Sequence, residues 1–243
     1  MAPGGAKALA GRRVVLTGAS RGIGRAAALR LARGGAQVLA VARDVQALSA
    51  LALEAKSLAG QVFHHSCDLT DPDEIEALAG IAARRLGGVD ALVNNAGGGV
   101  FRELEELAPE DFEATLAICL KAPFLLIRAL APMLEASGGE VVNVSSTAAV
   151  TGFPGAAAYC AAKAGLEGMS RALAEELRPR GVRLSVLRPG ATATGMWKNI
   201  PGEYDLEKMI PPELVAESIE FLLTQSRRAW TETMVVLPPE GRI

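Results

Sequence analysis

The stretch from Arg13 to Gly24, RVVLTGASRGIG, runs from a short apolar segment through three glycines into the start of a helical pattern. Glycines at such a turn let a pyrophosphate approach the backbone, and the free amides and dipole of a helix start favour its negative charge. The motif is weak alone, but a strand before it, a helix after it and a position at the first crossover make it specific. The stretch therefore predicts a dinucleotide-binding α/β fold.

The rest of the chain repeats this alternation of Val- and Leu-rich runs with longer helical patterns, which predicts a parallel sheet covered by helices on both faces. Strands are predicted over Arg13–Thr17, Gln37–Ala42, Gln61–Cys67, Ala91–Asn94, Glu140–Ser145, Arg183–Arg188 and Met234–Leu237. Helices are predicted over Gly22–Arg33, Val45–Leu58, Pro72–Leu86, Pro109–Glu135, Ala157–Arg178 and Pro212–Thr224. No linker or repeat divides the chain, so we expect one domain over residues 1–243.

Composition argues against several classes of protein. A formal net charge of -2 offers no electrostatic footprint for nucleic acid or an anionic membrane. No run approaches the roughly 18 consecutive apolar residues that span a bilayer, and Met1 to Arg13 lacks the apolar centre of a secretion signal. Cys67, Cys119 and Cys160 lack C-x-x-C or metal-ligand spacing, which favours reduced thiols. We expect a cytoplasmic protein that binds no metal, nucleic acid or membrane.

A second group of residues carries chemistry: Tyr159 and Lys163, with Ser146 upstream. A phenol and an ammonium four residues apart on a helix stand one turn apart on the same face. The positive charge stabilises the phenolate and brings the pKa of the tyrosine closer to working pH, so the phenol can serve as a general acid or base. Taken alone, the same pair is also typical of an apolar contact beside a lysine whose stem lies along the helix.

In their order along the chain, these features resemble the small single-domain branch of the short-chain dehydrogenase/reductase family, and the resemblance covers nearly the whole sequence. It rests on T-G-x-x-x-G-x-G at Thr17–Gly24, and on Asn94–Gly97, Ser146, Tyr159 with Lys163, and Pro189–Gly190. The resemblance implies a Rossmann-type, doubly wound, seven-stranded parallel sheet with strand order 3-2-1-4-5-6-7 and helices on both faces.

The end of the second predicted strand bears on the cofactor. An acidic residue there would bond the hydroxyls of an adenosine ribose and repel a 2′-phosphate, whereas this chain has Ala42 followed by Arg43. The small residue leaves room, and Arg43, reinforced by Arg21 in the glycine loop, supplies countercharge. We therefore expect NADP(H). The alternative is that Arg43 is a solvated charge ahead of a helix whose N-cap is Asp44.

The resemblance places further cofactor contacts after the third, fourth and sixth strands. Asp68 would accept from the adenine amino group, the alternative being that it caps a turn before Asp71-Pro72. Thr192 and Thr194 would hold the nicotinamide carboxamide. The implied cofactor-binding residues are Gly18, Ser20, Arg21, Gly22, Ile23, Gly24, Arg43, Asp68, Leu69, Asn95, Ala96, Gly97, Tyr159, Lys163, Pro189, Gly190, Thr192 and Thr194.

The same resemblance implies the catalytic roles. Tyr159 would give a proton to a carbonyl oxygen as hydride arrives, Lys163 would bond the nicotinamide ribose and lower the pKa of the phenol, and Ser146 would orient the substrate oxygen. Cys119 departs from the family, which has an Asn at this position as a fourth catalytic residue. In the family that residue bends its helix, and its carbonyl holds a water that relays protons. We expect the carbonyl to survive but the amide bonds that stabilise the bend to be lost; packing as a small apolar residue is the alternative.

The expected activity is that of an NADP(H)-dependent carbonyl reductase or alcohol dehydrogenase acting on a small, apolar substrate. One alternative is a 3-oxoacyl ketoreductase of fatty-acid or polyketide synthesis, for which Lys121 and Arg128 are candidate contacts to an acidic carrier. Another is a cofactor-binding sensor without turnover. The intact Ser146, Tyr159 and Lys163 argue against the sensor.

Two further expectations concern the pocket and the assembly. Residues 190–211 are too long for a common connection and follow a strand's carboxyl end, so we expect a substrate lid there, with Phe101, Val150, Phe153 and Trp197 bordering the pocket. Small residues at Ala161, Ala164 and Gly165 allow close helix packing between subunits. The C-terminal segment departs from the family's usual pattern in a region that often forms a second interface. We therefore expect a homodimer as the minimum, with a homotetramer as the alternative.

Overall fold

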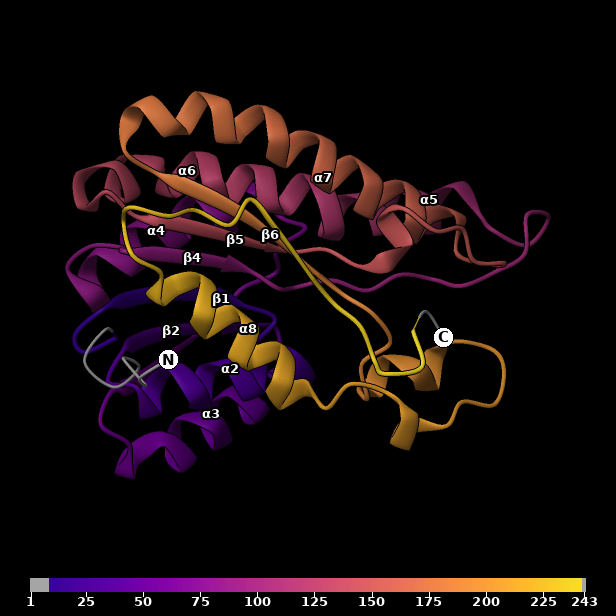
Figure 1. The fold of residues 1–243 in the computed structure, drawn as a ribbon, viewed down its shortest axis with the longest axis horizontal. Helices are drawn as coiled ribbons and strands as arrows, with labels where there is room; N and C mark the ends of the chain where they lie inside the picture. Colours follow the sequence, from indigo (N-terminus) through magenta and orange to yellow (C-terminus); the bar gives the residue numbers. More distant parts are fainter. Residues whose placement is uncertain (1–8, 242–243) are drawn as a thin grey trace.

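Seven parallel strands form one sheet in the computed structural model, which describes residues 9–241. Their order, β3-β2-β1-β4-β5-β6-β7, confirms the expected doubly wound α/β class (Figure 1). The strands are β1 (Arg13–Thr17), β2 (Gln37–Ala42), β3 (Gln61–Ser66), β4 (Ala91–Asn94), β5 (Glu140–Val144), β6 (Arg183–Pro189) and β7 (Thr233–Val236). Residues 1–8, part of the segment expected to precede the first strand, lie outside the described residues.

Helices cover both faces of the sheet (Figure 1). One face carries α2 (Gly22–Arg33), α3 (Val45–Glu54) and α8 (Pro212–Thr224), and the other carries α4 (Pro72–Leu86), α5 (Pro109–Leu116), α6 (Ala122–Ser137) and α7 (Ala157–Leu177). Each face has its own buried apolar cluster. Leu16 and Val15 are neighbours in β1 but belong to different clusters, because successive side chains of a strand point to opposite faces.

Local sequence signals set the helix ends. The Asp44 side chain accepts a hydrogen bond from the Ala47 amide at 2.9 Å, which confirms Asp44 as the N-cap of α3. α4 starts at Pro72 and ends at Gly87, whose φ of 72° is the left-handed conformation that favours glycine. The connections contain the short helical turns η1 (Ala55–Ser57), η3 (Thr147–Ala149), η4 (Arg178–Arg180), η5 (Gly195–Asn199) and η6 (Leu206–Lys208).

The helical stretch Pro109–Ser137 departs from the single regular helix that the sequence predicts. A π-helical turn, η2 (Ala117–Lys121), separates α5 from α6. By length and composition the stretch is apolar enough to cross a membrane, with a hydropathy of 1.8. Leu126, Leu130 and Leu134, however, are at most 1% exposed and pack in the core cluster with β1 and β4. The apolar character of this stretch is therefore that of a helix packed on a sheet.

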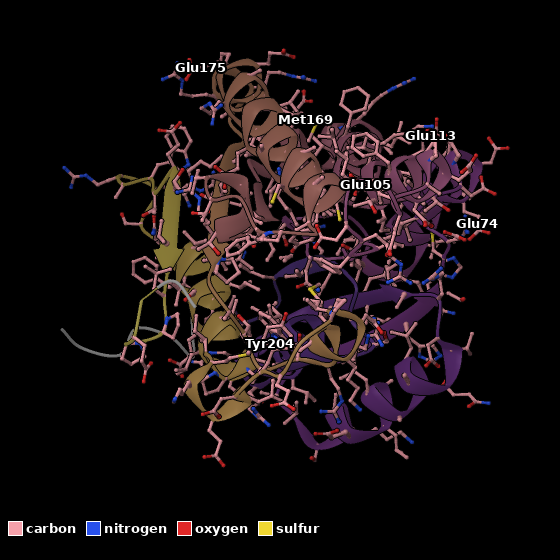
Figure 2. The ribbon with its side chains drawn as sticks, turned by 90° about the vertical axis from the view of Figure 1, so that its right-hand side faces the viewer. Glu74, Glu105, Glu113, Met169, Glu175 and Tyr204 are labelled. Carbon is pink, nitrogen blue, oxygen red and sulfur yellow. The ribbon has the colours of Figure 1, made fainter. Side chains whose placement is uncertain are left out.

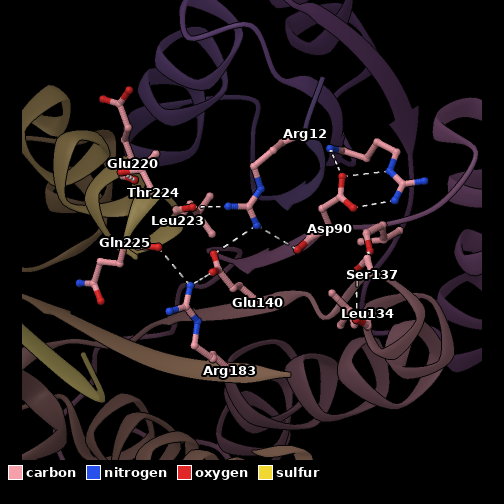
Figure 3. A network of polar contacts seen from close by, with 12 residues as sticks. Arg12, Asp90, Leu134, Ser137, Glu140, Arg183, Glu220, Leu223, Thr224 and Gln225 are labelled. Carbon is pink, nitrogen blue, oxygen red and sulfur yellow. Dashed lines mark hydrogen bonds and ion pairs between the residues drawn. The ribbon is translucent and has the colours of Figure 1, made fainter. Parts of the chain in front are cut away.

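A polar network joins the amino ends of the central strands (Figure 3). Arg13 donates to Asp90 through its backbone amide at 2.8 Å and through Nε and Nη2 at 2.9 and 2.6 Å. Glu140, only 4% exposed, forms ion pairs with Arg12 and Arg183. Burial alone would raise the pKa of Asp90, but the bonds from Arg13 outweigh burial and hold that pKa below its usual value.

The opposite, carboxyl edge of the sheet carries the long connections. The segment after β4, which includes Glu105, and the segment after β6, which includes Tyr204, both lie at this end of the molecule (Figure 2). In open α/β sheets the carboxyl edge is where ligands bind. The fold therefore brings the predicted site residues to one edge and the ion pairs of Asp90 and Glu140 to the other.

Candidate active site

The turn between β1 and α2 is shaped by glycines that leave no room for a side chain. A Cβ on Gly18 would lie 2.8 Å from the Ala96 Cα, and a Cβ on Gly24 would lie 2.2 Å from the Gly18 carbonyl oxygen. Gly18 and Gly22 also have positive φ values of 67° and 54°. No side chain caps the start of α2, so its first amides are available to an anion. This glycine cradle fits a pyrophosphate at a helix N-terminus.

Thr17 and Asn95 brace the glycine turn from behind. The Thr17 Oγ1 accepts from the amides of Asn95 and Ala96, both at 3.1 Å. The Asn95 side-chain amide donates to the Thr17 carbonyl at 3.0 Å and to the Gly18 carbonyl at 3.2 Å. The side chain of Asn95 is thus engaged with the loop itself. The bracing role of Thr17 was not predicted, because the segments it joins are distant in sequence.

The end of β2 has the arrangement expected from the sequence. Ala42 is buried at the strand's end, while the Arg43 and Arg21 side chains are exposed and form no salt bridge within residues 9–241. The Asp68 Oδ1 accepts from the amide and hydroxyl of Thr70 at 2.9 and 2.8 Å, and these bonds hold the pKa of Asp68 below its usual value. Asp68 therefore does cap the turn before Asp71-Pro72, as the alternative interpretation of this residue states.

Tyr159 and Lys163 stand one turn apart at the start of α7, and Ser146 lies beside them at the end of β5. The Lys163 Nζ lies 5.6 Å from the centroid of the Tyr159 ring. Burial raises the pKa of Tyr159, and Cys119 and Cys160 add to that rise, whereas a side-chain hydrogen bond with Ser146 opposes it. The Ser146 Oγ also accepts from the Ala148 amide at 3.1 Å. The pKa of the phenol therefore lies above its usual value, which is opposite to the lowering that the sequence predicted from Lys163.

Lys163 is 3% exposed and donates from Nζ to the Val144 carbonyl at 2.8 Å. Burial lowers the pKa of Lys163, while Cys119 and Glu167 act in the opposite direction. The carbonyl of Val144 fixes the ammonium at the end of β5, next to the segment that carries Ser146. This backbone acceptor is a part of the site that sequence reasoning missed, because a carbonyl has no residue-type signal.

Cys119 lies within the π-helical turn η2 and is 1% exposed. Its Sγ donates to the Gly98 carbonyl at 3.1 Å and accepts from the Gly98 amide at 3.4 Å. The helix is thus irregular at this position, and the thiol ties it to the segment after β4. The amide bonds of the family's asparagine are absent, as expected, and the thiol forms the two contacts to Gly98 in their place.

The Pro189–Gly190 turn leads into the segment that contains Thr192 and Thr194. The Thr192 Oγ1 donates to the Gly190 carbonyl at 3.0 Å. A Cβ on Gly22 would lie 3.2 Å from the Thr194 methyl group, so this segment lies against the glycine turn. Its arrangement places the two predicted cofactor segments side by side.

Trp197, which was expected to border the substrate pocket, lies beside a hollow on the α2 side of the glycine turn. Its Nε1 donates to the Thr192 carbonyl at 2.7 Å, and its ring centroid lies 4.5 Å from that of Tyr204. Trp197 lines a hollow of about 710 Å³ together with Gly22, Arg25 and Leu29 of α2. In this structure the indole therefore faces α2.

Two other expected pocket segments do meet beside Tyr159. The Arg102 amide donates to the Gly155 carbonyl at 2.9 Å, which joins the segments after β4 and β5. The Phe101 ring lies 5.7 Å from the Tyr159 ring, centroid to centroid, and is buried, while Val150 is 52% exposed. One side of the Tyr159 ring is therefore covered by a buried aromatic side chain. No three His, Cys, Asp or Glu side chains within residues 9–241 are grouped to hold a metal.

Comparisons with known proteins agree with this geometry. A family model described as short chain dehydrogenase matches residues 12–205. The D-threitol dehydrogenase of Mycolicibacterium smegmatis is 36% identical over 229 residues, which cover 90% of this chain and 88% of the relative. The 3-oxoacyl-[acyl-carrier-protein] reductase of Thermotoga maritima is 35% identical over 225 residues, with 88% and 91% covered. A solved metagenomic short-chain oxidoreductase in complex with NADP is 38% identical, with a TM-score of 0.85, 96% of this chain covered and 99% of that chain.

A parallel sheet with a glycine cradle at its carboxyl edge defines the class of dinucleotide-binding α/β proteins. The matched residues take in the cradle, the tyrosine and lysine of α7 and the Pro189–Gly190 turn. The chain therefore belongs to the short-chain dehydrogenase/reductase family of oxidoreductases.

Proposed function

We propose that the chain is an NADP(H)-dependent oxidoreductase that reduces a carbonyl to an alcohol, or catalyses the reverse, with Tyr159 as general acid and base. The observation that carries the proposal is the grouping of Tyr159, Ser146 and Lys163 next to the segment after β4 that packs on the glycine cradle. NADPH supplies a hydride when bound. The chain's own residues supply the proton and hold the reacting oxygen.

In the reduction, the protonated phenol of Tyr159 donates to the substrate oxygen. Its burial, which raises the pKa, keeps the proton available until the oxygen becomes basic. Ser146 holds the same oxygen by a hydrogen bond and stabilises its developing negative charge. Lys163, anchored on the Val144 carbonyl, places a positive charge near the phenolate that remains. In the oxidation, the phenolate must form first, so that direction favours higher pH.

The preference for NADP(H) is supported by the end of β2. Ala42 leaves space beside the ribose position, and the exposed Arg43 and Arg21 offer guanidinium groups to a 2′-phosphate. The solved relative in complex with NADP agrees with this choice. Asp68 and Leu69 would contact the adenine, Asn95 to Gly97 would line the adenosine ribose and the cofactor backbone, and Thr192 and Thr194 would hold the nicotinamide carboxamide.

Binding of NADPH and NADH, compared by thermal shift and fluorescence titration, tests the cofactor. We expect tighter binding of NADPH, and Arg43→Gln to weaken NADPH roughly tenfold or more while leaving NADH nearly unchanged, since a charge-assisted bond contributes about 1.5–3 kcal/mol. A preference of the wild-type chain for NADH would overturn the assignment.

Turnover of a panel of apolar ketones with the preferred cofactor tests the chemistry. Tyr159→Phe removes the proton donor and leaves the ring, so we expect cofactor binding to persist and turnover to fall by at least about a hundredfold. A Tyr159→Phe variant as active as the wild type would refute the role of the phenol. Cofactor binding without turnover of any ketone would instead favour the sensor alternative.

A 3-oxoacyl ketoreductase is the second candidate, which the Thermotoga maritima relative favours by its name. Lys121 and Arg128 are exposed and flank Phe124, which is 40% exposed, along one helical stretch. Such a basic and apolar stripe suits an acidic acyl carrier. Reduction of carrier-bound 3-oxoacyl chains that Lys121→Glu and Arg128→Glu weaken, without loss of activity on a free ketone, would support this substrate class.

The proposal also covers a substrate lid, the assembly of subunits and the cellular location. Residues 190–211 would act as a substrate lid, which is supported by the contact of Thr194 with the glycine turn. Ala161 and Ala164 are exposed on α7, which suits close packing against a partner subunit in a homodimer or homotetramer. A cytoplasmic location and a small, apolar substrate complete the proposal.

A further inference from the structure

Glu167 is a buried acid that none of the roles above uses. It lies on α7, the helix marked by Met169 and Glu175 in Figure 2, one turn beyond Lys163. The residue is only 4% exposed. A carboxylate is almost never buried so fully without compensating partners. Its position next to the proposed catalytic lysine therefore calls for an explanation.

The partners of Glu167 come from the ends of two strands. The Ser145 hydroxyl donates to Oε1 at 2.7 Å, and Arg188 donates to Oε1 through Nε at 2.9 Å and to Oε2 through Nη2 at 2.5 Å. Ser145 directly precedes Ser146, and Arg188 directly precedes the Pro189–Gly190 turn. One carboxylate thus ties α7 to the ends of β5 and β6.

Lys163 binds the same strand end. Its Nζ donates to the carbonyl of Val144, the residue before Ser145. Two side chains one turn apart on α7 therefore bind consecutive residues at the end of β5: the ammonium of Lys163 binds Val144 and the carboxylate of Glu167 binds Ser145. This double attachment fixes the register between α7 and the segment that carries Ser146.

The charges around the two groups come from several elements. Glu167 is faced by Arg188 of β6, by the hydroxyl of Ser145 and, further along α7, by Arg171. Burial alone would raise the pKa of Glu167, but the bonds from Arg188 outweigh burial and hold it below its usual value, so the acid is ionised at neutral pH.

Lys163 is faced by Cys119 from η2, by the Tyr159 ring and by Glu167 on its own helix. Its burial favours loss of the proton, and the negative charge of Glu167 opposes that loss. Without this acid, the ammonium would have less compensation in an apolar setting.

We propose that Glu167 is a positioning residue for the proposed active site: Arg188 and Ser145 hold its carboxylate where it balances the charge of Lys163 and ties α7 to the end of β5. This role rests on the proposed function, because its value is to keep Lys163 charged and Ser146 in place beside Tyr159. Glu167 itself does not touch the reacting atoms.

Two variants of one ion pair separate this role from simple structural support. Glu167→Gln removes the negative charge and Arg188→Gln removes the positive charge, while both amides retain hydrogen-bonding groups. We expect Glu167→Gln to lower the pKa of Lys163, because the ammonium loses a nearby negative charge. We expect Arg188→Gln to raise it, because the charge of Glu167 is then no longer balanced by Arg188. A pair that only holds segments together would move this pKa in the same direction in both variants, or leave it unchanged.

The measurement is an NMR titration of the full-length chain labelled with carbon-13 at the lysine ε position. The chain has only six lysines, so the Lys163 resonance can be assigned by its loss in Lys163→Arg. Opposite shifts in the two variants support the proposal, and equal or absent shifts overturn it. If Glu167→Gln does not fold, Arg188→Gln decides alone: a raised pKa supports the role, and an unchanged or lowered one overturns it.

Kinetics provides a second readout that also tests the proposed function. In the alcohol oxidation, kcat should rise as the pH becomes alkaline. The pH at which it rises should shift in opposite directions in Glu167→Gln and Arg188→Gln, and Glu167→Asp should restore most of the wild-type pH profile. Opposite pKa shifts of Lys163 without any turnover would leave the electrostatic pairing standing and refute the enzymatic function. Turnover abolished by Tyr159→Phe but with identical pH profiles in both variants would keep the function and refute the positioning role.

Discussion

Cys119 shows at the residue scale how a different side chain can preserve a local bond pattern. Its Sγ contacts both backbone groups of Gly98, one as donor and one as acceptor. An asparagine amide also carries one donor group and one acceptor group. We therefore expect Cys119→Asn to fold and remain active, as measured by kcat and KM for the best ketone of the panel. Complete loss of activity in a folded Cys119→Asn would contradict this expectation.

A matched variant distinguishes bonding from packing at the same position. Cys119→Ala removes both bonds to Gly98 and leaves a small void, and we expect it to lower the free energy of unfolding by about 1–2 kcal/mol. Cys119→Ser keeps both hydrogen-bonding capacities and should lose less. If the alanine and serine variants had equal stability in denaturant titrations, the thiol would act only by filling space.

The residues of the proposed site were predictable where local geometry decides their position. Tyr159 and Lys163 share a helix face because four residues make about one turn. The acceptor for Lys163, the carbonyl of Val144, and the acid Glu167 with its partner Arg188 were not predicted. Those contacts depend on how α7 lies over β5 and β6, and single-residue patterns do not contain that information.

At the scale of an element, the turn from β1 into α2 leaves no room for a side chain at its glycines. A Cβ on Gly24 would lie 2.2 Å from the Gly18 carbonyl oxygen and 2.5 Å from the Asn95 Nδ2, and the backbone oxygen cannot rotate away. We expect Gly24→Ala to lower the free energy of unfolding by more than about 2 kcal/mol and to weaken NADPH binding. Denaturant titration and fluorescence titration measure the two effects.

Gly168 provides the control, because it is also helical but has space. A Cβ there would lie 3.7 Å from the flexible end of Arg171 and meets nothing closer. Gly168→Ala should therefore stabilise α7 by up to about 1 kcal/mol through helix propensity alone. If Gly24→Ala were as benign as Gly168→Ala, close backbone packing would not be the reason for glycine in the cradle.

The sequence predicted the bounds of helices whose ends carry proline or glycine, but it did not predict the one irregular turn in Pro109–Ser137. Pro72 and Gly87 mark the ends of α4 as predicted, because proline favours a helix start and glycine a left-handed end. The π-helical turn over Ala117–Lys121 was missed, because one extra residue in a turn hardly changes the apolar pattern. The bonds from Cys119 to Gly98 that accompany it are tertiary contacts.

At the scale of the whole molecule, the two edges of the sheet have different tasks. The carboxyl edge collects glycine turns, a lysine with depressed proton affinity and largely apolar walls. The amino edge collects ion pairs between strands that are distant in sequence, such as Arg13 with Asp90 and Arg183 with Glu140. Stability that depends on the amino edge can therefore change without altering the site.

A variant of Asp90 tests whether the amino edge affects stability without affecting the site. The contribution of Asp90 to the free energy of unfolding depends on pH. Its folded-state pKa lies below the unfolded value, since the bonds from Arg13 outweigh burial. The stability that it adds is therefore complete above the unfolded pKa of about 3.9 and is lost as pH falls through the folded-state pKa. We expect Asp90→Asn to lower the free energy of unfolding by about 2 kcal/mol at pH 7, because it weakens a charge-assisted pair.

Urea titrations at pH 7, 5 and 3 would measure this difference, which should be constant from pH 7 to 5 and shrink toward pH 3. Glu175→Gln is the control. The side chains of Glu175 and Arg178 form an ion pair but are 63% and 62% exposed, so this pair should contribute little to stability at any pH. Cofactor affinity should be the same in both variants as in the wild type. A large loss of NADPH binding in folded Asp90→Asn would show that the amino edge also shapes the site, and equal stability losses in the two variants would show that burial of the Asp90 pair adds nothing.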